Sequence, residues 1–154
     1  MRGKRITPRK IIPDPVYNSV DITRFINTVM LSGKKTVAQK IVYSSLDKFN
    51  QAVEAKNLDG FQKAIDNVRP RIELRSRRVG GANYQVPYEV NEEKGKVRAI
   101  KWLIEAARKR KGADMVTDLV TEFTDAFNNV GSAVKKREDT AKMAEANRAF
   151  SHFR

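Results

Sequence analysis

Residues 69–90, RPRIELRSRRVGGANYQVPYEV, limit the possible folds of this chain most strongly. Apolar and polar residues alternate with period two on both sides of two glycines, which is typical of a β-hairpin and not of a helix. Glycine tolerates the positive φ that a tight turn needs. We predict a three-residue loop, Gly80-Gly81-Ala82, because this register sets Leu74 opposite Tyr88 and keeps the apolar residues on one face.

This hairpin is expected to project from the protein and to bind an anion. Its outgoing strand is strongly basic, with Arg71, Arg75, Arg77 and Arg78. The sequence offers no third strand, and a ribbon of two strands alone is marginally stable in water. Its outer half, Arg75 to Val86, is expected to have few apolar neighbours and therefore to be mobile in the free protein until a partner orders it. Pro87 has no N–H to donate, so its position is expected to face solvent.

Helical periodicity dominates the rest of the chain. Apolar residues recur at i, i+3, i+4 and i+7 in six segments. These are predicted at about 20–31, 37–50, 60–68, 96–111 and 115–128, with a last helix that begins between Lys136 and Asp139. The expected N-terminal caps are Ser19, Thr36 with Gln39, Asp59 and Asp114. The prediction is a mainly α fold: a six-helix bundle with a protruding two-stranded β-hairpin between helices three and four.

Residues 1–16 are predicted to form a basic, extended N-terminal tail before a single helical domain at 17–154. The tail carries Arg2, Lys4, Arg5, Arg9 and Lys10. Prolines at positions 8, 13 and 15 favour extended backbone, and too few apolar residues are present to bury. Alone, this segment should be disordered.

The charge of the chain points to nucleic acid. Lysine and arginine exceed aspartate and glutamate by 13 in 154 residues, a surplus typical of nucleic-acid-binding proteins. There is no cysteine and no apolar run of membrane-spanning length. The basic N-terminus lacks the apolar stretch of a signal peptide, so we expect a cytoplasmic location.

Clusters of cations near helix ends are the candidate nucleic-acid-binding residues beside those of the tail and hairpin. They are Lys34, Lys35, Arg108, Lys109, Arg110, Lys111, Lys135, Lys136, Arg137, Lys142 and Arg148. Four cations in succession at positions 108–111 exceed what complementing a helix dipole needs. We expect these clusters to gather on surfaces that face the nucleic acid. Removing the charges of Lys109, Arg110 and Lys111 should lower nucleic-acid affinity and shift the melting temperature by only a few degrees.

Catalytic chemistry is not indicated. The single histidine, His152, is two residues from the end, and no metal-ligand spacing or nucleotide-binding glycine motif occurs. We therefore expect no enzyme activity, no cofactor, no metal site and no small-molecule substrate. Trp102 is interpreted as a core or interface anchor rather than as a base-stacking residue.

Several longer strings are similar to one protein family. They are GGANYQVP on the hairpin, WLIEAARKRK closing the fourth helix, AVKKREDTAKMAEANRAF near the end, DPVYNS and LSGKK. The chain resembles the bacterial-type small-subunit ribosomal protein seven family over essentially its whole length.

This resemblance implies a primary binder of small-subunit rRNA, in the 3′ major domain, that nucleates assembly of the subunit head. It implies contacts with the ninth and eleventh small-subunit proteins. It also implies that the hairpin lies near exit-site tRNA and mRNA, through Arg77, Arg78, Gly80, Gly81, Asn83 and Tyr84. There are two alternatives from the residues alone. One is a basic helical DNA-binding protein, although the charge lies on tail, loops and ribbon and not on a recognition helix. The other is an RNA-modifying enzyme, although no cofactor motif or catalytic constellation is visible in the sequence.

Overall fold

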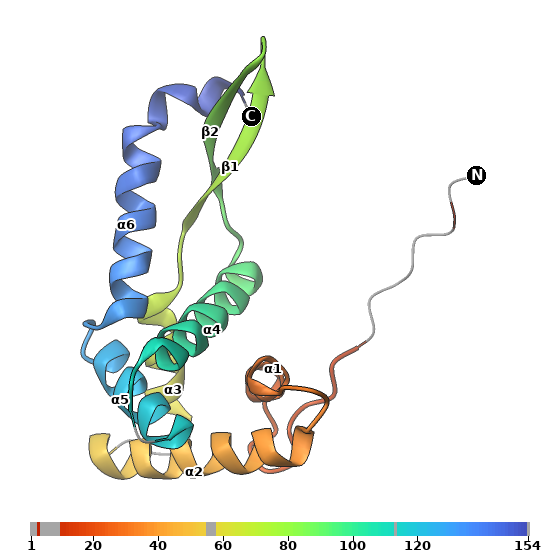
Figure 1. The fold of residues 1–154 in the computed structure, drawn as a ribbon, viewed down its shortest axis with the longest axis vertical. Coiled ribbons are helices and arrows are strands. Elements are labelled where there is room, and N and C mark those ends of the chain that lie inside the picture. Colours follow the sequence, from red (N-terminus) through yellow and green to blue (C-terminus); the bar gives the residue numbers. More distant parts are fainter. Residues whose placement is uncertain (1–2, 4–9, 55–57, 113, 154) are drawn as a thin grey trace.

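The computed structural model describes residue 3 and residues 10–54, 58–112 and 114–153 (Figure 1). These form a mainly helical fold with one antiparallel hairpin between the third and fourth helices, which confirms the predicted fold class. The elements are α1 (Val20–Val29), α2 (Lys35–Val53), α3 (Asp59–Val68), β1 (Ile72–Val79), β2 (Ala82–Glu89), α4 (Glu92–Lys109), α5 (Met115–Phe127), α6 (Ser132–Ala146) and the 3₁₀ helix η1 (Arg148–Phe153).

The molecule has a helical body and one long projection (Figure 1). Helices α1 to α5 form the body, with α2 along its lower edge. The hairpin rises from the body, α6 runs alongside it, and η1 reaches across to its outer half. The sequence did not predict that a helix would accompany the hairpin.

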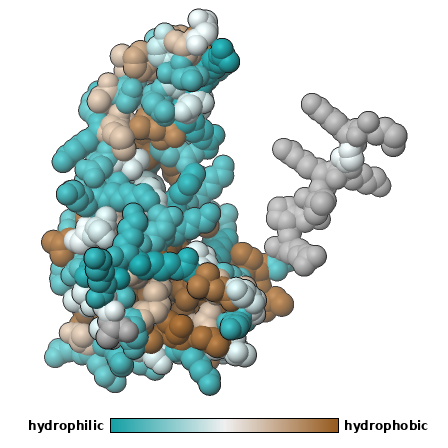
Figure 2. All heavy atoms as spheres, viewed as in Figure 1, coloured by the Kyte–Doolittle hydropathy of each residue, from teal (hydrophilic) through white to brown (hydrophobic). Residues whose placement is uncertain are grey.

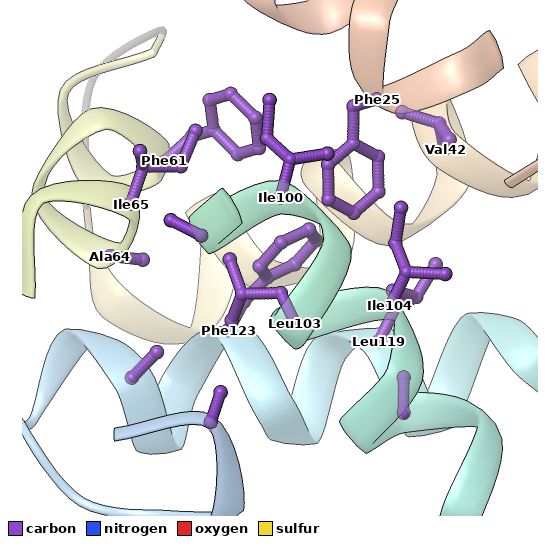
Figure 3. Packing of buried hydrophobic residues seen from close by; sticks show 14 of the residues in the cluster. Phe25, Val42, Phe61, Ala64, Ile65, Ile100, Leu103, Ile104, Leu119 and Phe123 are labelled. Atoms are coloured by element: carbon purple, nitrogen blue, oxygen red, sulfur yellow. The ribbon is translucent and has the colours of Figure 1, made fainter. Parts of the chain in front are cut away.

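The core is centred on Phe123 of α5, which is fully buried. Its ring centroid lies 5.4 Å from that of Phe25, 5.5 Å from that of Phe49 and 5.7 Å from that of Phe61, so α1, α2 and α3 all meet α5. Figure 3 shows Phe25, Phe61 and Phe123 packed around Ile100 and other side chains of α4. These residues belong to the apolar stripes from which the helices were predicted.

The predicted register of the hairpin is wrong. The turn has two residues, Gly80 and Gly81, with φ of 57° and 88°, and Leu74 pairs with Pro87 instead of Tyr88. The prediction assumed that one face of the ribbon is solvated, so that all apolar residues must share the other. In the structure both faces carry apolar side chains: Leu74 and Pro87 on one, and Val86, fully buried, on the other.

Both faces can be apolar because the hairpin is covered by the C-terminal part of the chain. Helix α6 packs on β1 and η1 packs on β2. Pro87 is buried, which corrects its predicted exposure to solvent. The outer half also has apolar neighbours, since the ring of Tyr84 lies 5.1 Å from that of Phe150 and 5.0 Å from that of Phe153.

Helices α4 and α6 begin a full turn or more before their predicted starts. Helix α4 starts at Glu92 and not near Lys96, because the Asn91 side chain accepts a hydrogen bond from Lys94 N at 3.0 Å. Helix α6 starts at Ser132 and not between Lys136 and Asp139. Its first turn is capped from another helix, since Glu122 Oε1 accepts from Ala133 N at 3.1 Å. A cap supplied by a distant residue leaves no local sequence signal.

The other predicted caps have mixed outcomes. Ser19 is the N-cap residue of α1 but makes no side-chain capping bond. Asp114 caps α5 as predicted, accepting from Thr117 N at 2.7 Å. The capping box at Thr36 does not form, because α2 begins at Lys35 and its N-cap residue, Lys34, makes no side-chain capping bond. Asp59 is not a cap either: it is the first residue of α3, and the helix follows Leu58.

The end of the predicted tail is fixed to the body. Asp14 is 3% exposed and accepts hydrogen bonds from Val16 N and Tyr17 N and, at 2.6 Å, from Tyr43 Oη of α2. Thr23 Oγ1 donates to the carbonyl of Ile12 at 2.9 Å. The chain therefore contacts the body before position 17. Of the five tail cations only Lys10 lies within the described residues, and it is exposed.

The Asp14–Tyr43 bond predicts a pH dependence. Burial, and then the bond to Asp14, raise the pKa of Tyr43 to about 12. A pKa raised on folding means that the contribution to stability is complete below pH ~10, the value of an unfolded tyrosine, and is lost as pH approaches about 12. Subtracting the phenolate absorbance titration of Tyr43→Phe from that of the original protein should isolate one tyrosine that titrates well above the usual value of about 10. A difference curve centred near pH 10 would contradict the prediction.

Candidate nucleic-acid interface

A hollow of about 430 Å³ lies where α1, α4 and the base of the hairpin meet. Its lining includes five cations, from α1, β1 and α4: Arg24, Arg75, Lys94, Arg98 and Lys101. Two carboxylates, Glu73 and Glu93, lie among them, and Val97 contributes apolar wall. The hollow therefore carries an excess of positive charge on three rigid elements.

Ion pairs hold several of these cations in place. Arg24 Nη2 lies 2.7 Å from Glu93 Oε1, and Arg98 Nη2 lies 3.4 Å from Glu73 Oε2. Arg75 Nε donates to Glu73 Oε1 at 2.6 Å. Burial opposes ionisation of Glu73, but the bonds and charges of Arg75 and Arg98 hold its pKa below the usual value. Both arginines keep further N–H donors that an incoming phosphate can use.

The surface around the hollow is hydrophilic. In Figure 2, long hydrophilic side chains cover the middle of the face, between the hairpin and the helices below it, while hydrophobic residues gather lower down, beside α1. An RNA backbone that follows this face would meet cations from separate parts of the chain.

Four of the five cations were not predicted from the sequence as binding residues. Only Arg75 was a candidate; Arg24, Lys94, Arg98 and Lys101 were not. A signal was present, because positions 94, 98 and 101 fall at i, i+4 and i+7 and so share one face of α4. That this face meets the hairpin base and α1 is tertiary information.

The predicted hairpin cations are divided between two environments. Arg75 faces the hollow, with its guanidinium 5.0 Å from the centroid of the Tyr88 ring. Arg77 donates to the carbonyl of Phe153 in η1. Arg71 and Arg78 are exposed, and within the described part of the chain neither makes an ion pair. The structure thus leaves Arg71 and Arg78 available and uses Arg77 internally.

The cations at the end of α4 also have different environments. Lys109 and Lys111 are exposed. Arg108 Nη2 donates to the carbonyl oxygens of Thr28 and Val29 at 3.3 and 3.2 Å, so it caps the last turn of α1. Arg110 is half-buried and pairs with Glu122.

Arg110 pairs with Glu122, a carboxylate at 0% exposure, and this corrects its interpretation as a free surface cation. Its Nη2 lies 2.7 Å from Glu122 Oε2, its Nε donates to the same oxygen at 3.0 Å, and it also bonds Asp125. Glu122 in turn caps α6. The expectation that removing all three charges of residues 109–111 leaves the melting temperature nearly unchanged is therefore withdrawn for Arg110.

The cations of α6 are partly engaged as well. Lys136 Nζ lies 2.7 Å from Glu105 Oε2 of α4, and Arg137 donates to the carbonyl of Asn67 in α3. Both join α6 to the body. Arg148 pairs with Glu145 in a largely exposed contact. Lys135 and Lys142 are exposed and, among the described residues, form no ion pair.

The remaining candidate residues belong to the start of α2, the N-terminal segment and the hairpin tip. Lys34 and Lys35 are exposed at the start of α2, next to Gly33 with φ of 73°. Arg2, Lys4, Arg5 and Arg9 lie outside the described residues. The residues expected near tRNA and mRNA are at the hairpin tip: Arg77, Arg78, Gly80, Gly81, Asn83 and Tyr84. Of these, Tyr84 is half-buried beneath η1 and not free to stack on both faces.

Two further findings concern the described residues as a group. Histidines and carboxylates are not grouped in threes in any way that could hold a metal ion within residues 10–54, 58–112 and 114–153. The helices in this part of the chain are also too short or too polar to span a bilayer.

Comparison with known proteins identifies the family. The family model for ribosomal protein S7p/S5e matches residues 1–148. The chain is 51% identical over 154 residues to the small ribosomal subunit protein uS7 of Petrotoga mobilis, covering 100% of this chain and 99% of that protein. It is 53% identical over the same shares to uS7 of Nautilia profundicola. With uS7 of Methylobacterium radiotolerans it shares 56% identity over 146 residues, 95% of this chain and 94% of that protein. The chain therefore belongs to the ribosomal protein S7p/S5e family and has, by membership, a structural role in the small ribosomal subunit.

Proposed function

We propose that this protein binds the rRNA of the small ribosomal subunit as a primary binder in the 3′ major domain and nucleates assembly of the subunit head. The observation that carries the proposal is the hollow with five cations on three rigid elements. Folded RNA places phosphates from different helices close together, and neutralising them releases counterions. Fixed arginine forks suit this phosphate geometry.

The hairpin and the apolar surface support the finer parts of the proposal. The tip carries exposed Arg78 and Asn83 at the far end of the projection, which suits contact with exit-site tRNA and mRNA. Leu31 and Val37 are 66% and 51% exposed beside the α1–α2 corner. Apolar surface of this kind suits protein neighbours, for which we propose the ninth and eleventh small-subunit proteins.

The direct test compares two nucleic acids at physiological salt. Filter binding with a 3′ major domain fragment of small-subunit rRNA should give much tighter binding than a DNA duplex of equal length. The reason is that separated cationic surfaces match a folded RNA better than one continuous duplex. Equal or tighter binding to the duplex would favour a DNA-binding protein instead.

The affinity is also expected to fall steeply with salt. Each phosphate neutralised contributes about 0.7–0.9 to the slope of log K against log salt concentration. Because the hollow alone offers five cations, the slope should correspond to several phosphates. Titrations of the rRNA fragment between low and physiological salt measure it. A slope that fits only one or two phosphates would argue against a footprint that includes the hollow and the exposed lysines together.

A further inference from the structure

A second, smaller hollow adjoins the cationic one. It lies where α4, β1 and α6 approach one another and has a volume of about 240 Å³. Its lining combines Trp102, Leu74, Met143 and Pro70 with Arg98, Glu73 and Thr140. The sequence analysis had assigned Trp102 to the core or an interface.

The walls of this hollow suit a flat apolar group. Trp102 is half-buried: part of it packs on the core and part lines the hollow. Met143 is 50% exposed, although it is a large apolar residue. The volume is below the roughly 300–1,000 Å³ that drug-sized ligands occupy. The space therefore fits a single ring system and not a whole cofactor.

Polar groups around the hollow could recognise the edge of such a ring. Thr140 Oγ1 donates to the carbonyl of Lys136 at 2.7 Å, so its lone pairs remain able to accept a hydrogen bond. Arg98 uses Nη2 to reach Glu73 at 3.4 Å and, as an arginine, has further N–H donors. An apolar wall with an acceptor and a donor at the rim matches a nucleobase.

The two hollows are joined through shared residues. Glu73 and Arg98 line both. A nucleic-acid strand with a phosphate among the cations would thus have its neighbouring base beside Trp102. Charge complementarity favours this occupant over an apolar segment of another protein.

We propose that the second hollow binds one unpaired RNA base, stacked on Trp102, while the adjoining phosphate lies against Arg98 and the other cations of the first hollow. This inference rests on the proposed binding of rRNA. It assigns a base-contacting role to Trp102 and Met143 in addition to phosphate contacts, which carry no sequence information by themselves.

The test uses the fluorescence of Trp102, the one tryptophan in the sequence. Stacking of a base quenches indole emission. The rRNA fragment should therefore quench the full-length protein strongly, whereas inorganic polyphosphate at saturating concentration should compete with the RNA but leave the emission nearly unchanged.

Two substitutions separate stacking from packing. Trp102→Leu keeps an apolar side chain without a π face and should weaken binding of the rRNA fragment roughly tenfold, whereas Trp102→Phe should bind within about twofold of the original protein. Affinity for polyphosphate should be the same in all three proteins. Loss of affinity for both probes in Trp102→Leu would show a structural role and overturn the proposal.

The outcomes distinguish this inference from the proposed function. If the fragment binds tightly but leaves the emission unchanged, or if polyphosphate quenches equally, the base site is refuted and rRNA binding stands. If the fragment fails to bind in the filter assay, both are refuted. Lys94→Gln is the matched control: it should weaken binding of both probes and leave the quenching by saturating RNA intact.

Discussion

Replacing Arg110 by methionine is expected to lower the free energy of unfolding by about 3 kcal/mol, because it leaves Glu122 as an unpaired charge in the interior. Glu122 is at 0% exposure and takes two hydrogen bonds from Arg110. Arg110 itself is 30% exposed, which keeps the expectation at the lower end for broken buried pairs. In a chain of this length the melting temperature should fall by roughly 10 °C.

Thermal and urea unfolding measure the effect, and neighbouring residues provide controls. Lys109→Met and Lys111→Met remove exposed charges from the same run and should change stability by about 0.5 kcal/mol or less. Glu122→Gln neutralises the buried group and keeps an oxygen for Ala133 N. The double variant Arg110→Met/Glu122→Gln should therefore lose less than the two single losses added together. Strict additivity would show that the ion pair is not what stabilises this junction.

The same geometry decides how the RNA contacts of this run should be tested. A triple substitution at positions 109–111 would lower affinity through unfolding as well as through lost charge. Substituting only Lys109 and Lys111 isolates the electrostatic part, because both are exposed while Arg110 joins α4 to α5 and the start of α6. Their removal should reduce RNA affinity without the fall in melting temperature.

The helices and the hairpin could be predicted because their signals are local. A period of 3.6 residues marks the stripes that contain Phe25 and Phe123, and a period of two with paired glycines marks the ribbon. The cap at Asp114 was predicted for the same reason, since the capping residue and the amide it binds are three residues apart.

Features that depend on residues distant in sequence were either predicted wrongly or not predicted. Glu122 of α5 caps the first turn of α6. No local sequence signal therefore marked the start of this helix, and it was predicted to begin later. The predicted register of the hairpin was wrong because α6 and η1 cover the ribbon, so that apolar side chains lie on both of its faces. The composition of a basic run also does not show which of its cations pair with buried carboxylates. Arg110 and Lys109 are neighbours in one run, yet of the two only Arg110 has a buried partner.

Substituting Phe150 and Phe153 by alanine is expected to loosen the outer half of the hairpin while the helical body stays folded. The rings of both residues pack on Tyr84, and Arg77 donates to the carbonyl of Phe153. Each aromatic pair contributes about 0.5–1.5 kcal/mol beyond its buried area, so amides near Tyr84 should lose roughly thirtyfold in protection. Two strands without this cover return to the marginal stability of an isolated ribbon.

Hydrogen exchange on the free protein measures this directly, with α1 and α5 as internal references. Arg148→Gln, which removes an exposed side chain from the same 3₁₀ helix, is the matched control and should leave protection at the tip unchanged. The tip amides should be better protected in the original protein than in the double variant. In the original protein they should still be less protected than the amides of the core helices. Tip amides that exchange at the same rate in all three proteins would show that η1 does not brace the hairpin, and that ordering of the tip would have to come from a bound partner.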